Sequence, residues 1–212
     1  MTAPVAGIGE APRRGDAIDV SELPSYGFSH RSLMWWGTAG VIAIEGTVFV
    51  LAAVAYFYLW SQSSHWPMSA VPPDLLWGTV NTGVLLASVV PNQWAKHAAQ
   101  KHDLHAVRRY ILIALAFAVA FLLIRIFEFR SLNVGWDWNA YGSIVWMLMG
   151  LHTAHLLTDA YDTSVLAALM HTDRIEGKRF VDVAENALYW DFVVISWVPI
   201  YAIVYWAPRW LS

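Results

Sequence analysis

The sequence contains no cysteine and few charged residues, and both shortages exclude whole classes of protein. Without cysteine there is no disulfide, no thiolate metal centre and no cysteine nucleophile, and the redox compartment cannot be inferred. Charged residues fill only 14% of the 212 positions, against about 25% in an ordinary soluble domain. The formal net charge of −3 is also too small to indicate nucleic-acid binding.

Apolar and aromatic residues are abundant instead. Hydrophobic residues make up 58% of the chain, whereas soluble domains contain roughly 45–50%. A soluble core cannot hide such an excess, so the composition predicts that lipid surrounds most of the chain. The 13 Trp and nine Tyr support this prediction, because their amphipathic rings collect at membrane interfaces.

Five apolar segments predict an all-α, polytopic membrane helix bundle with five transmembrane helices. Helices are expected because a backbone in lipid must satisfy its own hydrogen bonds. Each segment reaches or approaches the roughly 20 residues that cross about 30 Å of hydrocarbon. The predicted spans are 33–60, 75–90, 110–127, 141–157 and 188–206, within one membrane domain at 30–212.

Proline residues and an acidic turn set the expected ends of these segments. Pro91 should end or kink the second span before a polar helical extension. The fourth helix should continue to about Met170, and the fifth span should follow the acidic turn DVAE and stop at Pro208. The first 29 residues are rich in Gly and Pro without an apolar run, which predicts a flexible cytoplasmic tail and not a signal peptide.

The distribution of basic residues predicts the orientation. The N-terminal segment and the connections after the second and fourth spans hold all but three of the 13 Lys and Arg residues. The opposite side has only Arg130 and Arg209, and Arg125 lies within the third span. Because Lys and Arg favour the cytoplasmic side, we expect a cytoplasmic N-terminus, an external C-terminus and a multi-pass protein of a bacterial-type inner (plasma) membrane.

Glu45 lies inside the first apolar span. It is about eleven residues along, or roughly 16 Å at 1.5 Å per residue, which places it near mid-bilayer. Charges at that depth are costly and suggest function or partners. Glu45 is therefore either a proton-handling or lipid-headgroup site, or a neutral carboxyl that is hydrogen-bonded to a neighbouring helix.

The fourth span carries the densest polar cluster, which we call the His/Asp stripe. Its members are spaced three, four and three residues apart and fall within about 80° of one helix face; they are His152, His155, Asp159 and Asp162. A divalent metal is one possible ligand, but no second helix offers a matching set. A polar seam facing helices, lipid headgroups or a wet cavity is favoured, with Glu185 and Asp191 placed to face it.

Arg125 and Glu128 are i,i+3 neighbours at the outer edge of the third span, which predicts a local ion pair with a structural role. The sequence contains no nucleotide-binding loop, Ser–His–Asp arrangement or haem-ligand pattern. We therefore expect no catalytic, cofactor-binding or metal-binding residue in this chain.

Five stretches in order resemble subunit III of the haem–copper oxidases, in its five-helix form. They are IAIEGTVFVLAAVAYFYLW, HWPMSAVPP with VNTGVLLASVV, RIFEF, GLHTAHLL and ENALYWDFVVISWVPIYAIVYW. The chain departs from the family pattern along the polar seam. Arg125 stands in place of Gln, Thr153 and Asp159 in place of Gly, Asp191 in place of His, and Val194 in place of Asp. We therefore expect Asp191 to pair with His152 or His155, and Asp191→Asn to weaken assembly.

The resemblance implies a non-catalytic subunit of a proton-translocating oxidoreductase complex. Such a subunit packs against subunit I and carries no haem or copper, which belong to the partner subunits I and II. It binds structural phospholipid in a cleft, supports proton uptake and protects the complex during turnover. Glu45, His152 and His155 are the matching positions.

Two alternatives remain open. One is an accessory protein of a nitric oxide reductase, which shares the five-helix pattern. The other is an independent transporter or metal-handling protein that uses the His/Asp stripe.

Overall fold

The computed structural model describes residues 27–172 and 176–211, and within these ranges every regular element is helical. A 3-10 turn, η1 (Ser29–Arg31), precedes the first helix. The long helices are α1 (Leu33–Gln62), α2 (Leu75–Gln100), α3 (Leu104–Arg130), α4 (Ala140–Met170) and α5 (Lys178–Tyr201). A π-helical turn, η2 (Ala202–Trp206), and the short α6 (Ala207–Trp210) complete the chain. The predicted all-α class is confirmed.

The predicted boundaries are partly correct. The helical extension beyond Pro91 is present, because α2 continues through Pro91 to Gln100, and α4 ends at Met170 as predicted. α3 begins at Leu104, before the predicted apolar span, because Asp103 caps it by accepting a hydrogen bond from the Ala106 amide at 3.1 Å. The predicted limits of the fifth span are wrong, because the DVAE segment lies inside α5 and Pro208 lies in the first turn of α6, where proline is tolerated.

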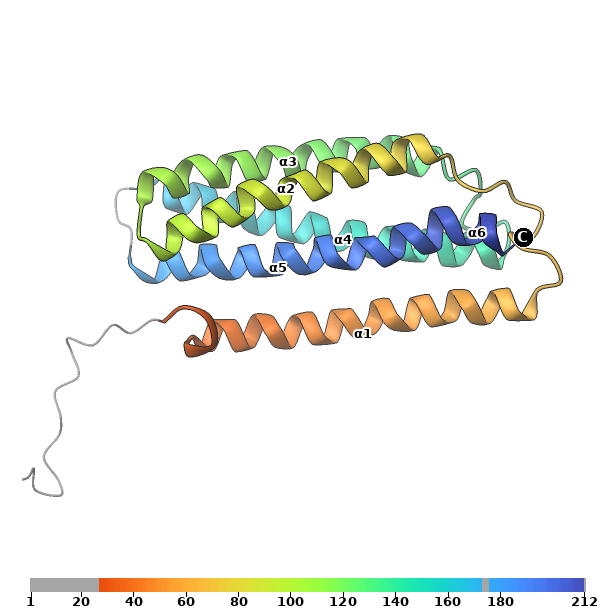
Figure 1. The fold of residues 1–212 in the computed structure, drawn as a ribbon, viewed down its shortest axis with the longest axis horizontal. Coiled ribbons are helices and arrows are strands. Elements are labelled where there is room, and N and C mark those ends of the chain that lie inside the picture. The colour runs from red at the N-terminus through yellow and green to blue at the C-terminus, as the bar shows by residue number, and fades with distance from the viewer. Residues whose placement is uncertain (1–26, 173–175, 212) are drawn as a thin grey trace, which may run out of the picture.

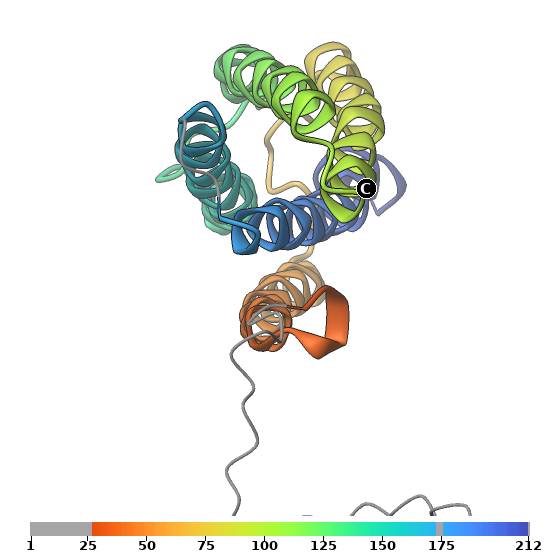
Figure 2. The same cartoon turned by 90° about the vertical axis from the view of Figure 1, so that its left-hand side faces the viewer.

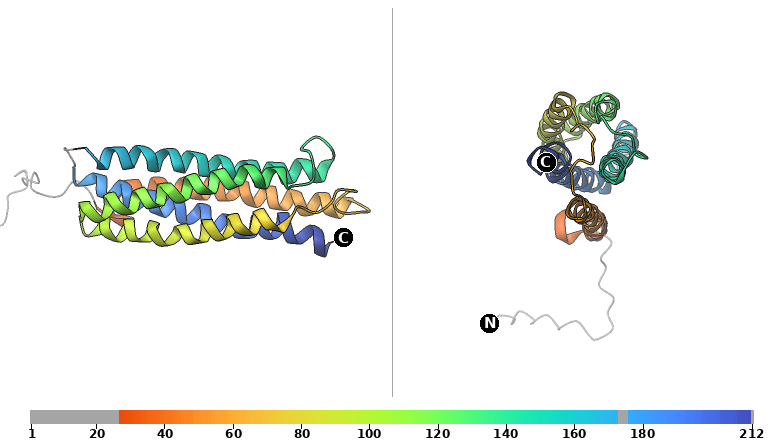
Figure 3. Two further views of the ribbon diagram at one scale, coloured as in Figure 1. Left: turned by 90° about the horizontal axis from the view of Figure 1, so that it is seen from above. Right: turned by 90° about the vertical axis from the view of Figure 1, so that its right-hand side faces the viewer.

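In the part of the chain that the structure describes, three elements are long and apolar enough to cross a membrane by themselves: α1, α3 and α5 with its continuation to Trp210. α2 and α4 are less apolar, but their 26 and 31 residues span about 39 and 46 Å at 1.5 Å per residue. All five long helices lie along one axis (Figures 1 and 3). The architecture is therefore a membrane helix bundle whose two less apolar members run beside the three apolar ones.

Four of the helices, α2 to α5, enclose the core, and α1 lies outside them. Seen along the bundle axis, α2–α5 form a ring and α1 lies below it (Figure 2). Fully buried Leu85, Phe121, Leu148 and Trp197 fill the ring, one from each helix. α1 contacts α4 and α5. The ring is thus a four-helix bundle to which α1 adds one outer layer.

α1 is attached to the bundle by its second half. Its buried residues are Phe49, Ala52 and Tyr56, and none of the residues before Phe49 in this helix is buried. Tyr56 is anchored from the following loop, since Trp66 Nε1 donates to its hydroxyl at 2.9 Å. The first half of α1 therefore leaves space beside α4 and α5.

We call the end of the bundle where α1 begins the basic end, after the Lys and Arg residues that the sequence places on that side. The connection 101–103, the end of α4 and the start of α5 lie there, whereas the α3–α4 connection and the end of α6 lie at the opposite end (Figure 1). The predicted tail at 1–29 lies outside the described residues up to residue 26. Phe28 is part of the fold, because its ring meets that of His102 edge-on at 5.6 Å.

Candidate functional site: a buried charge network and an acidic cleft

The predicted ion pair is present, but it lies in the bundle interior. Arg125 Nη1 is 2.9 Å from Glu128 Oε2, and the two side chains are 2% and 0% exposed. The i,i+3 spacing on α3 places both groups on one helix face. That face points into the ring of helices, so a pair expected at the outer edge of the span is enclosed by protein.

Glu128 joins two further elements through its carboxylate. Asn81 Nδ2 of α2 donates to Oε2 at 2.7 Å, and the Tyr205 hydroxyl of η2 donates to Oε1 at 2.6 Å. Sequence reasoning missed both donors. Asn81 is the one amide side chain in the span 75–90 and was a usable signal, whereas nothing local marks Tyr205 among nine tyrosines.

Arg125 is held between aromatic rings and a histidine. Its guanidinium carbon lies 4.2 Å from the ring centroid of Trp197 and 4.6 Å from that of Phe121, in cation–π contact. Its Nη2 is 3.1 Å from Nδ1 of His152. Together with Glu128, these contacts place the guanidinium at the junction of α3, α4 and α5. We call Asn81, Arg125, Glu128, His152 and Tyr205 the charge network.

The charge network fixes the state of His152. Arginine can only donate, so His152 Nδ1 accepts. Nε2 then carries the hydrogen and donates to the Val193 carbonyl oxygen at 3.0 Å. Both ring nitrogens are occupied, and His152 is a neutral, fully buried imidazole. It is therefore not available as a metal ligand in this arrangement.

His155 faces the other way, toward α1. Its Nδ1 bonds the Leu151 carbonyl oxygen at 2.6 Å, so Nδ1 carries a hydrogen, and its Nε2 is 3.5 Å from Glu45 Oε1. Glu45 Oε2 accepts a hydrogen bond from the Tyr189 hydroxyl at 2.7 Å. The contact between Nε2 and Oε1 becomes a hydrogen bond only when a proton lies on the imidazole nitrogen or on the carboxyl group. Glu45 is thus joined to α4 and α5.

A cleft of about 720 Å³ opens beside this contact, between α1, α4 and α5, and we call it the acidic cleft. One part of its lining carries charge, and the other part is apolar. The carboxylates in its lining are Glu45, Asp159, Asp162, Asp182 and Glu185, and the apolar residues include Met34, Val41, Val165, Leu166 and Leu169. Four of the predicted site residues (Glu45, Asp159, Asp162 and Glu185) are therefore brought together here.

Two further predictions for the polar seam concern Asp191 and the His/Asp stripe. The expected pairing of Asp191 with a histidine is wrong, because Gln93 Nε2 of α2 donates to Asp191 Oδ2 at 2.6 Å. The His/Asp stripe is divided, since His152 faces the charge network while Asp159 and Asp162 line the cleft. Among the described residues, no three His, Cys, Asp or Glu side chains are grouped closely enough to hold a metal ion.

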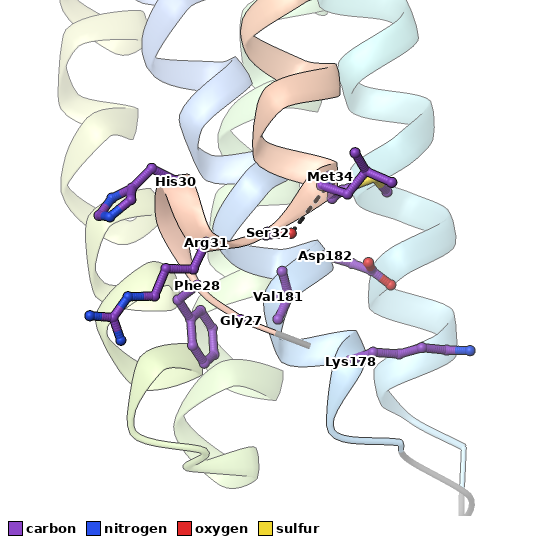
Figure 4. A pocket seen from close by; sticks show the side chains of 10 residues that line it. Gly27, Phe28, His30, Arg31, Ser32, Met34, Lys178, Val181 and Asp182 are labelled. Carbon is purple, nitrogen blue, oxygen red and sulfur yellow. Dashed lines mark hydrogen bonds between the residues drawn. The ribbon is translucent and has the colours of Figure 1, made fainter. Parts of the chain in front are cut away.

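A second hollow of about 880 Å³ lies at the basic end, between η1 and the start of α5. Figure 4 shows that His30 and Arg31 extend to one side of the hollow and Lys178 to the other. Lys178 Nζ is also engaged by Glu176 Oε2 at 2.8 Å. This hollow has no convergent set of ligands, so the charge network and the acidic cleft are the candidate functional sites.

Comparison with known proteins agrees with this architecture. The model of the family described as cytochrome c oxidase subunit III matches residues 59–209, which include α2 to α5 but not Glu45. Cytochrome c oxidase subunit 3 of Pongo abelii is 27% identical over 177 residues, covering 78% of this chain and 67% of that protein. The protein of the same name from Synechocystis sp. is 25% identical over 183 residues, covering 83% and 76%. The family match spans well over half of the sequence, and the chain therefore belongs to the cytochrome c oxidase subunit III family.

Proposed function

We propose that this chain is the non-catalytic subunit III of a respiratory haem–copper terminal oxidase. The observation that carries the proposal is the family match over residues 59–209. In this role the chain packs against subunit I in a complex that also contains subunit II. Haem and copper belong to those partners, and this chain performs no redox step.

The arrangement of the buried polar groups favours a structural role for this chain over a catalytic one. Arg125 and Glu128 form an ion pair with each other, and Glu128 also accepts a hydrogen bond from a neighbouring helix. His152 is occupied on both nitrogens. Intramembrane ionisable groups usually mark pathways or partners. Here the carboxyl groups of the acidic cleft are ionisable groups that line a cavity. The cleft is thus the part of the chain that acts on other molecules.

Two activities of the cleft follow from its lining. Its apolar wall beside the loosely attached half of α1 suits an acyl chain, so we assign structural phospholipid to it. Its carboxylates and the contact between Glu45 and His155 suit proton collection for subunit I. The cleft would then open at the cytoplasmic side, where protons enter the complex.

A pull-down from the native membrane tests the subunit assignment. The tagged chain, extracted in a mild detergent, should bring down larger partners and a haem absorbance spectrum. A colourless chain that purifies alone and turns over a substrate, or binds a divalent ion with its His/Asp stripe, would overturn the proposal. Oxygen and nitric oxide consumption by the purified complex then separate an oxidase from a nitric oxide reductase.

Proton collection has a separate test. Neutralising the cleft carboxyl groups of Asp159, Asp162 and Glu185 together should slow oxidase turnover at alkaline pH, where protons are scarce. The effect at acidic pH should be smaller, because bulk protons are then abundant. Unchanged turnover of the triple variant at alkaline pH would remove proton uptake from the proposal and leave the subunit assignment standing.

A further inference from the structure

The lining of the acidic cleft contains more carboxyl groups than basic side chains. Five carboxylates line it, and Arg179 is the one Lys or Arg among its described lining residues. Arg179 is already engaged, because its Nη1 donates to Asp182 Oδ2 at 3.1 Å. Lys96 of α2 also acts on Glu185 electrostatically. The remaining carboxylates favour a positively charged occupant.

Two buried carboxylate oxygens in this lining lack a hydrogen-bond donor. Asp159 is 1% exposed and Glu185 is 5% exposed. Asp159 Oδ2 and Glu185 Oε2 have no hydrogen-bond partner among the described residues. Leaving a buried polar oxygen without a hydrogen-bond partner costs on the order of 1–3 kcal/mol, so these oxygens mark a place where a hydrogen-bonding group outside this chain belongs.

The surroundings of Asp159 leave Oδ2 for such a donor. Asn186 Nδ2 donates to the other oxygen, Oδ1, at 3.3 Å. Asn186 is itself held by Thr163, whose hydroxyl donates to Asn186 Oδ1 at 3.1 Å. The acidic neighbour of Asp159 on α4 is Asp162, which opposes a second negative charge at Asp159. A cation bound beside these two groups would offset that repulsion.

The lining and the volume of the cleft favour an ammonium group over a metal ion as the bound cation. No group of three metal-ligating side chains lies there among the described residues, so the site does not resemble a preformed metal cage. An ammonium group donates three hydrogen bonds and can serve acceptors on different helices. The volume of about 720 Å³ and the apolar wall also leave room for a larger molecule attached to that group.

We propose that the acidic cleft binds an ammonium group between Asp159 Oδ2 and Glu185 Oε2, and thereby selects amine-bearing ligands over anionic ones. The apolar wall favours a phospholipid with an ethanolamine headgroup as the source of that ammonium; a free small amine is the other source. The inference deepens the lipid role proposed above and rests on it. Asp159 stands where the family pattern has glycine, so the site belongs to this divergent chain.

Lipid retention by the intact complex tests the proposal. The complex is placed in nanodiscs of equal phosphatidylethanolamine and phosphatidylglycerol, mildly delipidated, and its retained lipids are measured by mass spectrometry. We expect the ethanolamine lipid to be enriched about tenfold, the order that a charge-assisted hydrogen bond supplies. The double variant Asp159→Asn/Glu185→Gln should lose the enrichment, whereas Asp137→Asn, an exposed aspartate at the opposite end, should keep it.

A second arm identifies the source of the ammonium group. Free ethanolamine is titrated into nanodiscs that contain only phosphatidylglycerol. Saturable binding that the double variant loses, without enrichment of the ethanolamine lipid, supports the ammonium site with a free amine as ligand. No enrichment and no ethanolamine binding in the wild-type complex overturns the proposal, even where the double variant does not assemble. Equal retention of both lipids contradicts selection of the ethanolamine headgroup but not phospholipid binding in the cleft. A chain that brings down no partner counts against the proposed subunit function and not against the ammonium site.

Discussion

At the scale of single residues, Arg125 shows how a buried charge is accommodated in this bundle. Its side chain is 2% exposed, lies against two aromatic rings and forms an ion pair with Glu128. Two charges removed from water gain little when paired, but removing one partner strands the other. The stability of the pair therefore depends on both residues being present.

Arg125→Met should lower the free energy of unfolding by about 3–5 kcal/mol, because Glu128 is left buried without its cation. The matched control is Arg130→Met, which removes an exposed arginine from the same helix and should change little. Thermal unfolding of the detergent-solubilised protein measures both. Equal stability of the two variants would contradict the role assigned to the network.

Gly78 is the other residue on which the network depends. A Cβ at this position would lie 2.7 Å from Tyr205 Cε1 and nearer still to Cζ, which is closer than non-bonded carbon atoms approach. Gly78→Ala should displace the Tyr205 ring from Glu128 and destabilise the protein by about 1–3 kcal/mol, as overpacking does. Gly83→Ala on the same helix is the control, since nothing lies within 4 Å of its added Cβ. If both variants unfold at the same temperature, the close packing at Gly78 has no energetic weight.

At the scale of elements, the π-helical turn η2 is tied to the charge network. It spans Ala202–Trp206 and carries Tyr205, whose hydroxyl donates to Glu128. A π turn changes the direction in which later side chains point relative to a regular helix, and such turns are frequent at functional sites. Pro199 lies just before it within α5 and removes one helical donor. The local irregularity thus accompanies the delivery of a donor to a buried carboxylate.

The attachment of α1 depends on its second half, where Tyr56 is fully buried and Tyr58 is 63% exposed. Tyr56→Ala should cost about 3–5 kcal/mol, as for other large buried aromatic side chains. Tyr58→Ala should remain within about 0.5 kcal/mol of the wild type, because Tyr58 lies on the outer surface. The two variants are compared by thermal unfolding and by release of α1 to limited proteolysis. A larger loss for Tyr58→Ala would mean that α1 is held in another way.

At the scale of the whole molecule, the bundle has a basic end and an opposite end, and the charge distribution predicts which end faces the cytoplasm. The chain has no cysteine, so single introduced thiols report on topology without background. A membrane-impermeant maleimide added to intact cells should label an Asp137→Cys variant. It should label a Gln100→Cys variant only after the membrane is permeabilised, because Lys and Arg hold the basic end inside.

Both positions are exposed in the structure, so access of the reagent is not limited by packing. Labelling of the Gln100→Cys variant in intact cells, with protection of the Asp137→Cys variant, would reverse the predicted orientation. Labelling of both without permeabilisation would mean that the connections do not alternate between the two sides.

Composition and periodicity were sufficient for the class of the molecule. An excess of apolar residues over 212 positions requires lipid as solvent, and a backbone in lipid must form helices. The same local rules placed an ion pair at Arg125 and Glu128, since three residues on a helix bring two side chains together. The order of the five motifs also indicated the family that the residue match at 59–209 establishes.

The tertiary structure alone decided which polar groups meet across helices. Asp191 pairs with Gln93, 98 positions away, and Tyr205 reaches Glu128 across 77 positions. The rotation of each helix about its own axis sets such contacts, and that rotation depends on how all the helices pack together. It directs His152 into the ring of helices and His155 toward α1, although one turn of the same helix separates them. A single span contains no information about the face that its neighbours will cover.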